Sequence, residues 1–95
     1  MNIVLDGKKI LTEQGFHDKI AKVFDIQKYY GKNLDALWDT LSANVERPVH
    51  ITWINADVSR KNIDTFDDII KVFKKTKKQD EQFNWVDKFT YEIIP

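Results

Sequence analysis

The sequence predicts an α/β fold in which a small three-stranded parallel sheet packs with three to four helices. Three short segments have the composition or the alternation of β-strands, at residues 3–5, 49–53 and 89–94. Segments with the helical spacing of apolar side chains separate them, and this order is typical of parallel sheets with right-handed crossovers. No linker or repeat interrupts the 95 residues, so we expect a single domain over residues 1–95.

The first strand is followed by a helix with a recognisable start. Residues 3–5 are apolar and lead into Asp6 and Gly7, a turn signal. Apolar side chains then recur at the i, i+4, i+7 and i+8 positions of one helix face, at Phe16, Ile20, Val23 and Phe24. Thr12 lies just upstream, where its hydroxyl can accept a hydrogen bond from the first turn, so we expect it to cap this helix.

A second helix and the middle strand follow. The helix has apolar residues at i, i+3, i+4 and i+7, namely Leu34, Leu37, Trp38 and Leu41. Asn33 is placed to cap it, and Gly31 allows the chain to turn into it. Pro48 ends this unit, and residues 49–53 alternate between apolar and polar side chains, as a half-buried strand does.

The last part of the chain predicts a further helix and the last strand. Residues 55–63 are polar and fit either a loop or a short helix, whereas residues 66–73 have apolar side chains at helical spacing. Residues 76–87 lack a clear period and are predicted to form a surface loop. The side chains expected in the core are Phe16, Leu37, Leu41, Trp53, Phe66, Ile70 and Phe73.

Composition excludes several classes of protein. The net charge is zero, with 15 basic and 15 acidic residues, so the strongly basic footprint of a nucleic-acid-binding protein is absent. The chain has no cysteine, which excludes disulfides and thiolate zinc sites. The opening residues do not resemble a signal peptide, and no apolar run approaches the ~20 residues of a membrane span. We therefore expect a cytoplasmic protein that does not enter a membrane.

The two histidines do not indicate an enzyme. His17 is expected on a helix surface, and His50 alternates with its apolar neighbours, so it should point to the other face of the sheet, under a helix if one covers it. Neither lies in a catalytic motif, and the sequence has no glycine-rich phosphate loop, nucleophile elbow or metal-ligand spacing. We expect no catalytic residue, no metal and no cofactor.

The second predicted helix carries acidic residues that its own fold does not need. Asp35, Asp39 and Ser42 lie at i, i+4 and i+7, roughly 110° around the helix from its apolar face. Two carboxylates one turn apart repel each other, so the helix gains little from them, whereas a partner with clustered arginines would gain from both. The alternative is that Asp35 is a first-turn acid favoured by the helix dipole, which explains Asp39 poorly.

Residues 29–39, Tyr-Tyr-Gly-Lys-Asn-Leu-Asp-Ala-Leu-Trp-Asp, resemble the signature of the barstar family of ribonuclease inhibitors. The resemblance continues through residues 45–48 and Trp53 and, more weakly, along the whole chain. It implies a barstar-like fold and an intracellular inhibitor that plugs the active site of an extracellular-type or toxin ribonuclease in a 1:1 complex. The acidic helix and the loop before it would form the plug.

The resemblance also implies the residues that contact the nuclease. Asp39 would take the position of the substrate phosphate, since a carboxylate accepts forked hydrogen bonds from arginine as phosphate does. Asp35 would pair with a neighbouring basic group, Tyr29 would stack on the catalytic imidazole, and Trp38 would lie partly at the rim. The partner-binding residues expected on this basis are Tyr29, Gly31, Asn33, Asp35, Trp38, Asp39, Ser42 and Glu46.

The late helix departs from the family pattern. Lys75 replaces a family acid that contacts the nuclease, and Asp80 and Glu81 are the nearby acids that could substitute for it. Four lysines lie at i, i+3, i+4 and i+7 on one side of this helix, at Lys71, Lys74, Lys75 and Lys78. This basic stripe keeps two alternatives open, an immunity protein against a different toxin nuclease and a nucleic-acid-binding module. The simpler explanation is that acids start this helix and lysines end it, which complements the helix dipole.

Overall fold

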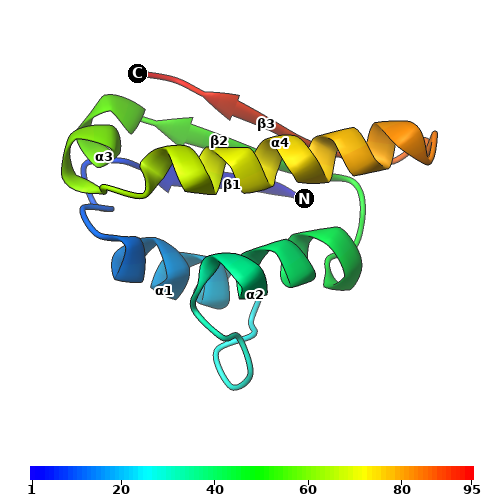
Figure 1. The fold of residues 1–95 in the computed structure, drawn as a ribbon, viewed down its shortest axis with the longest axis horizontal. Helices are drawn as coiled ribbons and strands as arrows, with labels where there is room; N and C mark the ends of the chain where they lie inside the picture. Colours follow the sequence, from blue (N-terminus) through cyan, green and yellow to red (C-terminus); the bar gives the residue numbers. More distant parts are fainter.

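The predicted strands form one parallel sheet. In the computed structural model, which describes residues 1–95, the strands are β1 (Asn2–Asp6), β2 (Val49–Ile54) and β3 (Phe89–Ile93). They pair in the order β1-β2-β3, with Ile51 of the central strand beside both Ile3 and Tyr91 (Figure 1). The three-stranded parallel sheet predicted from the sequence is confirmed.

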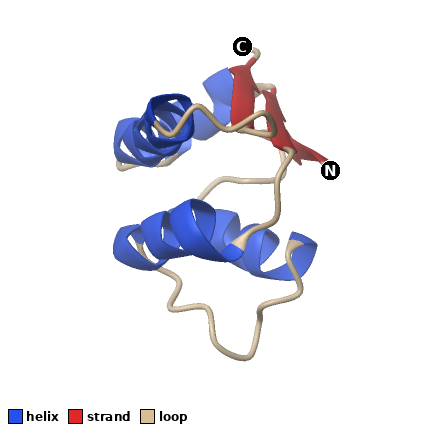
Figure 2. Cartoon of the chain, turned by 90° about the vertical axis from the view of Figure 1, so that its right-hand side faces the viewer, coloured by secondary structure: helices blue, strands red, loops and turns tan.

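The helices pack on one face of this sheet. They are α1 (Glu13–Val23), α2 (Leu34–Asp39), which continues as the π-helix η1 (Thr40–Asn44), α3 (Ala56–Asn62) and α4 (Phe66–Gln82). The chain advances from β1 to β2 and then to β3, and right-handed crossovers in this order place both helical connections on the same side of the sheet. Figure 2 shows the sheet at one margin of the molecule. None of the helices is both long and apolar enough to cross a bilayer.

Side-chain caps begin α1 and α2 as predicted. Thr12 Oγ1 accepts a hydrogen bond from the Gly15 N–H at 2.9 Å, and Asn33 Oδ1 accepts one from the Ala36 N–H at 2.8 Å. Each cap satisfies a first-turn donor that has no partner within the helix. Of the two alternatives for the polar residues 55–63, the helical one is right, because they contain α3.

The core is built around Trp53 of β2, which is fully buried. Its ring stacks on that of Phe16 from α1, with centroids 5.3 Å apart and planes 7° apart, and its centroid lies 4.9 Å from that of Phe66 in α4. Six of the seven predicted core residues are buried, namely Phe16, Leu37, Leu41, Trp53, Phe66 and Phe73. The exception is Ile70, which is half-buried because Ile69 occupies the core at that turn of α4.

The surface loop predicted at residues 76–87 is wrong for residues 76–82, because α4 continues to Gln82, and right for residues 83–87, which form an exposed turn and bend. Thr76 and Asp80 follow Phe73 at i+3 and i+7, so both extend the buried face of the helix. Because these two side chains are polar, the spacing of apolar residues does not reveal that the helix continues through them. The Thr76 hydroxyl donates to the Val72 carbonyl at 2.8 Å, which satisfies it within the helix.

His17 is also placed differently from the prediction. Its side chain is 1% exposed, inside the fold rather than on the helix surface. Its Nδ1 lies 2.6 Å from the Tyr30 hydroxyl and its Nε2 2.9 Å from the Glu13 carboxylate, so both ring nitrogens have partners. His50 does point to the other sheet face, but no helix covers it there, and its Nδ1 lies 2.7 Å from the Thr90 hydroxyl across the sheet.

A buried ion pair joins the end of α4 to the segment before β2. Arg47 donates to both oxygens of the Asp80 carboxylate, at 2.7 and 3.1 Å, and the fully buried Asp80 also accepts from the Phe89 N–H. Burial by itself raises the pKa of Asp80, but the hydrogen bonds from Arg47 and Phe89 outweigh it and hold that pKa below its usual value. Asp80 is therefore part of the fold and is not an exposed acid.

Truncation of the core face of α2 and η1 tests this packing. Leu37→Ala and Leu41→Ala should each lower the free energy of unfolding by about 2–5 kcal/mol, because both side chains are completely buried and would leave cavities. Urea denaturation measures the loss. The half-exposed Leu11 provides the control, and Leu11→Ala should cost much less. Losses below about 1 kcal/mol at both core positions would contradict the packing.

The ion pair predicts a specific acid sensitivity. Asp80→Asn should lower stability at neutral pH by about 3–5 kcal/mol, because it leaves the largely buried Arg47 charge without its counter-ion. Since the folded-state pKa of Asp80 is depressed, its contribution is complete above its usual pKa of 3.8 and is lost as pH falls below that value. The difference between wild type and variant should therefore shrink below pH ~4. Denaturation curves at several pH values test this, with the exposed Asp87→Asn as the control.

Candidate functional site

The loop between α1 and α2 is anchored from inside the fold. Tyr30 is 7% exposed, and its hydroxyl lies against His17, so the loop is fixed at this residue. Burial and then the charge of Glu13 raise the pKa of Tyr30, which keeps the phenol neutral. The pKa of Glu13 is lowered by hydrogen bonds from Thr65 and His17. The neighbouring Tyr29 is 76% exposed and presents its ring to solvent.

The loop enters α2 through a close approach of the backbone. A Cβ atom on Gly31 would lie 3.1 Å from the Ala36 side chain, which is tighter than ordinary contact. The Asn33 amide donates to the Gly31 carbonyl at 3.4 Å while its oxygen caps the helix. Gly31 and Asn33, two of the predicted site residues, therefore set the shape of the loop that carries Tyr29.

Three acids on this part of the surface have no basic partner. Asp35 and Asp39 on α2 and Glu46 beyond η1 are exposed, and no lysine, arginine or histidine lies within ion-pair distance of their carboxylates. The one side-chain hydrogen bond at Asp39 goes to its backbone carbonyl, from the Asn44 amide. Asp35 lies in the first turn of α2, where the helix dipole favours an acid. None of the three carboxylates forms an ion pair within the fold, so all three remain available to a partner.

The helix changes its winding immediately after Asp39. Residues Thr40–Asn44 form a π-helix, in which i→i+5 hydrogen bonds widen the turn, so the α-helical spacing assumed for Ser42 does not hold. Ser42 is half-buried, and its backbone carbonyl accepts a hydrogen bond from Gln79 of α4 at 3.1 Å. Single-turn π-helices occur often at functional sites. The sequence gives no signal for this change, because its apolar spacing stays compatible with an ordinary helix.

Trp38 lies at the border between α2 and α4. Its side chain is half-buried, as expected for a residue at a rim. The Lys75 ammonium group lies over its ring, 4.2 Å from the ring centroid. A cation over the face of an indole is attracted by the ring quadrupole. The contact joins the acidic helix to the basic stripe of α4.

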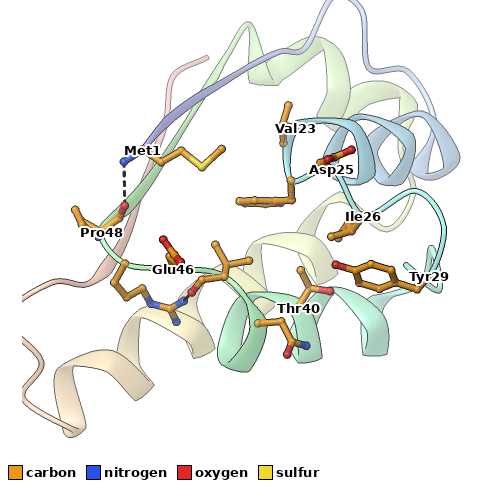
Figure 3. A pocket seen from close by; sticks show the side chains of 12 residues that line it. Met1, Val23, Asp25, Ile26, Tyr29, Thr40, Glu46 and Pro48 are labelled. Atoms are coloured by element: carbon orange, nitrogen blue, oxygen red, sulfur yellow. Dashed lines mark hydrogen bonds between the residues drawn. The ribbon is translucent and has the colours of Figure 1, made fainter.

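A cavity of about 440 Å³ separates the two ends of the predicted site. Figure 3 shows Tyr29 and Thr40 on one side of it and Glu46 on the other. Its apolar lining includes Val23 and Ile26. Tyr29 and Glu46 therefore share this cavity, whereas Asp35 and Trp38 lie outside its lining. The fold contains no cluster of three or more side chains that could hold a metal ion.

Sequence comparisons show which family this chain belongs to. The family model described as "Barstar (barnase inhibitor)" matches residues 1–89. The protein named "Putative ribonuclease inhibitor YrdF" from Bacillus subtilis (strain 168) is 31% identical over 78 residues, which cover 81% of this chain and 86% of that protein. The resemblance noted at residues 29–39 thus extends over nearly the whole chain. With its three-stranded parallel sheet and its exposed acidic helix, the chain belongs to the barstar family.

Proposed function

We propose that this protein is a ribonuclease inhibitor that binds its nuclease one to one and covers the active site with α2 and the loop before it. Membership of the barstar family and the name of the Bacillus subtilis relative support inhibition of a ribonuclease. The observation that carries the mechanism is the set of exposed, unpaired carboxylates at Asp35, Asp39 and Glu46. The protein acts by binding and not by catalysis, and residues 1–95 act as one domain.

The chemistry of the target explains why carboxylates serve this purpose. A ribonuclease must hold a phosphodiester, so its active site presents cationic hydrogen-bond donors. A carboxylate accepts two parallel hydrogen bonds from a guanidinium group, in the same forked geometry that a phosphate uses. In this proposal Asp39 occupies the phosphate position and Asp35 pairs with a neighbouring basic group. Asp39 suits the central position because it lies at the end of α2, between the other two acids in the chain.

The surrounding residues supply area and shape. Tyr29 offers a rigid exposed ring to a catalytic imidazole, and Trp38 covers the rim, since aromatic side chains contribute large contact areas at little entropic cost. Gly31 and Asn33 hold the loop in its conformation. Ser42 and Glu46 contact the nuclease from the far end of the helix. A carboxylate that is desolvated only when the nuclease covers it should make the largest single contribution.

Long-range charge assists the encounter. Residues 25–46 contain Asp25, Asp35, Asp39 and Glu46 against Lys28 and Lys32, a local net charge of −2. This patch attracts a basic active site and speeds association, mainly at low salt. We place the inhibitor in the cytoplasm, where a cysteine-free protein has no need of an oxidising environment.

Substitution of Asp39 tests the mechanism. Asp39→Ala should weaken binding to an inactive ribonuclease more than any other single truncation, by at least about 2 kcal/mol, because it also leaves the basic groups of the nuclease buried and unpaired. Calorimetric titration measures the loss. The free energy of unfolding should barely change, since the Asp39 carboxylate is exposed and forms no ion pair.

The matched control is Asp57→Ala, which removes an exposed acid from α3. It should bind like wild type. Inhibition by Asp39→Ala at nearly the wild-type level would exclude the phosphate-mimic mechanism, and a large change in stability would mean that Asp39 has a structural role.

A further inference from the structure

The basic stripe of α4 lines a groove next to the acidic helix. Residues 71–78 contain five lysines and no acid, and all five are exposed. Lys75 and Lys78 line a groove of about 400 Å³ together with Trp38 of α2 and Phe83 at the end of α4. Two glutamines, Gln79 and Gln82, complete the lining. We call this surface the α4 groove.

The α4 groove is continuous with the proposed inhibitory surface. The Lys75 ammonium group lies over the Trp38 ring, and the Gln79 amide donates to the Ser42 carbonyl. Two residues of α4 thus contact two residues of the segment that also carries Asp35 and Asp39. A nuclease that covers α2 has the α4 groove at its edge.

Apart from the contact between Lys75 and the Trp38 ring, the fold gives these lysines little stabilising role. The helix dipole favours cations only within the last turn, but α4 continues to Gln82 and its last turn has no basic residue. Of the five lysines, only Lys71 lies within ion-pair distance of an acid, at 3.8 Å from the exposed Asp68. The i, i+3 and i, i+4 spacings within the stripe bring like charges together, which destabilises a helix slightly. The dipole explanation from the sequence therefore does not hold for Lys75 and Lys78.

We propose that the α4 groove receives an acidic side chain of the same nuclease, so that the target has an acidic rim beside its basic active site. This inference rests on the proposed inhibitory function and specifies its partner. Lys75 and Lys78 supply two cations on one side of the groove, and Trp38 and Phe83 supply aromatic walls. Phe83 is 62% exposed and stacks on Trp85, so it is held in place for contact. The complementary pattern, basic centre and acidic rim, identifies the class of ribonuclease.

A protein fits this surface better than RNA does. A phosphodiester chain long enough to follow the lysines would also approach Asp35 and Asp39, whose charges repel it. Non-specific binding of nucleic acid depends on neutralising many phosphates, and the chain as a whole has no net charge. A folded partner can instead place positive and negative groups against matching patches.

The test compares two inactive microbial ribonucleases as probes, one with an acidic and one with a basic surface around its active site. At about 0.15 M salt, where screening limits charge effects to neighbouring groups, wild type should bind the acidic-rim probe about tenfold more tightly than the basic-rim probe, mainly through slower dissociation. Lys75→Glu combined with Lys78→Glu should reverse that preference. The control, Lys74→Glu with Lys77→Glu, makes the same charge change on the same helix but outside the groove lining. It should leave the ratio between the probes nearly unchanged.

Each outcome separates the possibilities. A wild-type preference for the basic-rim probe, or equal effects of the groove and control variants on the ratio, would overturn the inference. Loss of binding to labelled single-stranded RNA in the groove variant alone would overturn it in favour of a nucleic-acid site. Asp39→Ala should weaken binding to both probes by a similar factor. If Asp39→Ala leaves binding to both probes unchanged while the groove variant still changes the ratio of the two affinities, the phosphate-mimic mechanism fails and the groove inference stands.

Discussion

The order of the sheet is the constraint from which the functional surface follows. Because the chain crosses from β1 to β2 to β3 without reversing, right-handed crossovers bring both helical connections to one face. Trp53 of the central strand then contacts aromatic rings from both connections, Phe16 in α1 and Phe66 in α4. The inner sides of α2 and α4 pack into this core, and the two helices lie against each other. Their outer sides form one surface, with acids on α2 and lysines on α4.

Two buried polar contacts hold the ends of this surface. On one side Glu13, His17 and Tyr30 form a chain of hydrogen bonds that fixes the loop next to the exposed Tyr29. On the other side Arg47 and Asp80 fix the segment that follows Glu46. Such groups contribute little as isolated pairs once desolvation is counted, but removing one partner is costly. Both contacts lie next to residues of the proposed site, so the buried polar groups fix the backbone where the site needs a defined shape.

The apolar residues of the sequence predict most of the fold, and its polar residues account for the errors. The strands, the first two helices and the caps at Thr12 and Asn33 follow from periodicity and capping chemistry. The end of α4 and the position of His17 do not, because polar side chains that find buried partners look like surface residues in a sequence. The candidate site could be located from the motif at residues 29–39. Its cavity and the α4 groove could not, because they join segments that are distant in the chain.

The pair between Arg47 and Asp80 also has an evolutionary consequence. The two residues are 33 positions apart, yet each compensates a charge that the other would leave buried. A protein with a substitution at only one of the two positions is unstable, so descendants of this sequence should keep both residues or exchange them together. Exposed positions such as Lys74 and Lys77 carry no such coupling and can drift independently. Joint conservation of positions 47 and 80, or their joint exchange, would be the signature of this contact among homologues.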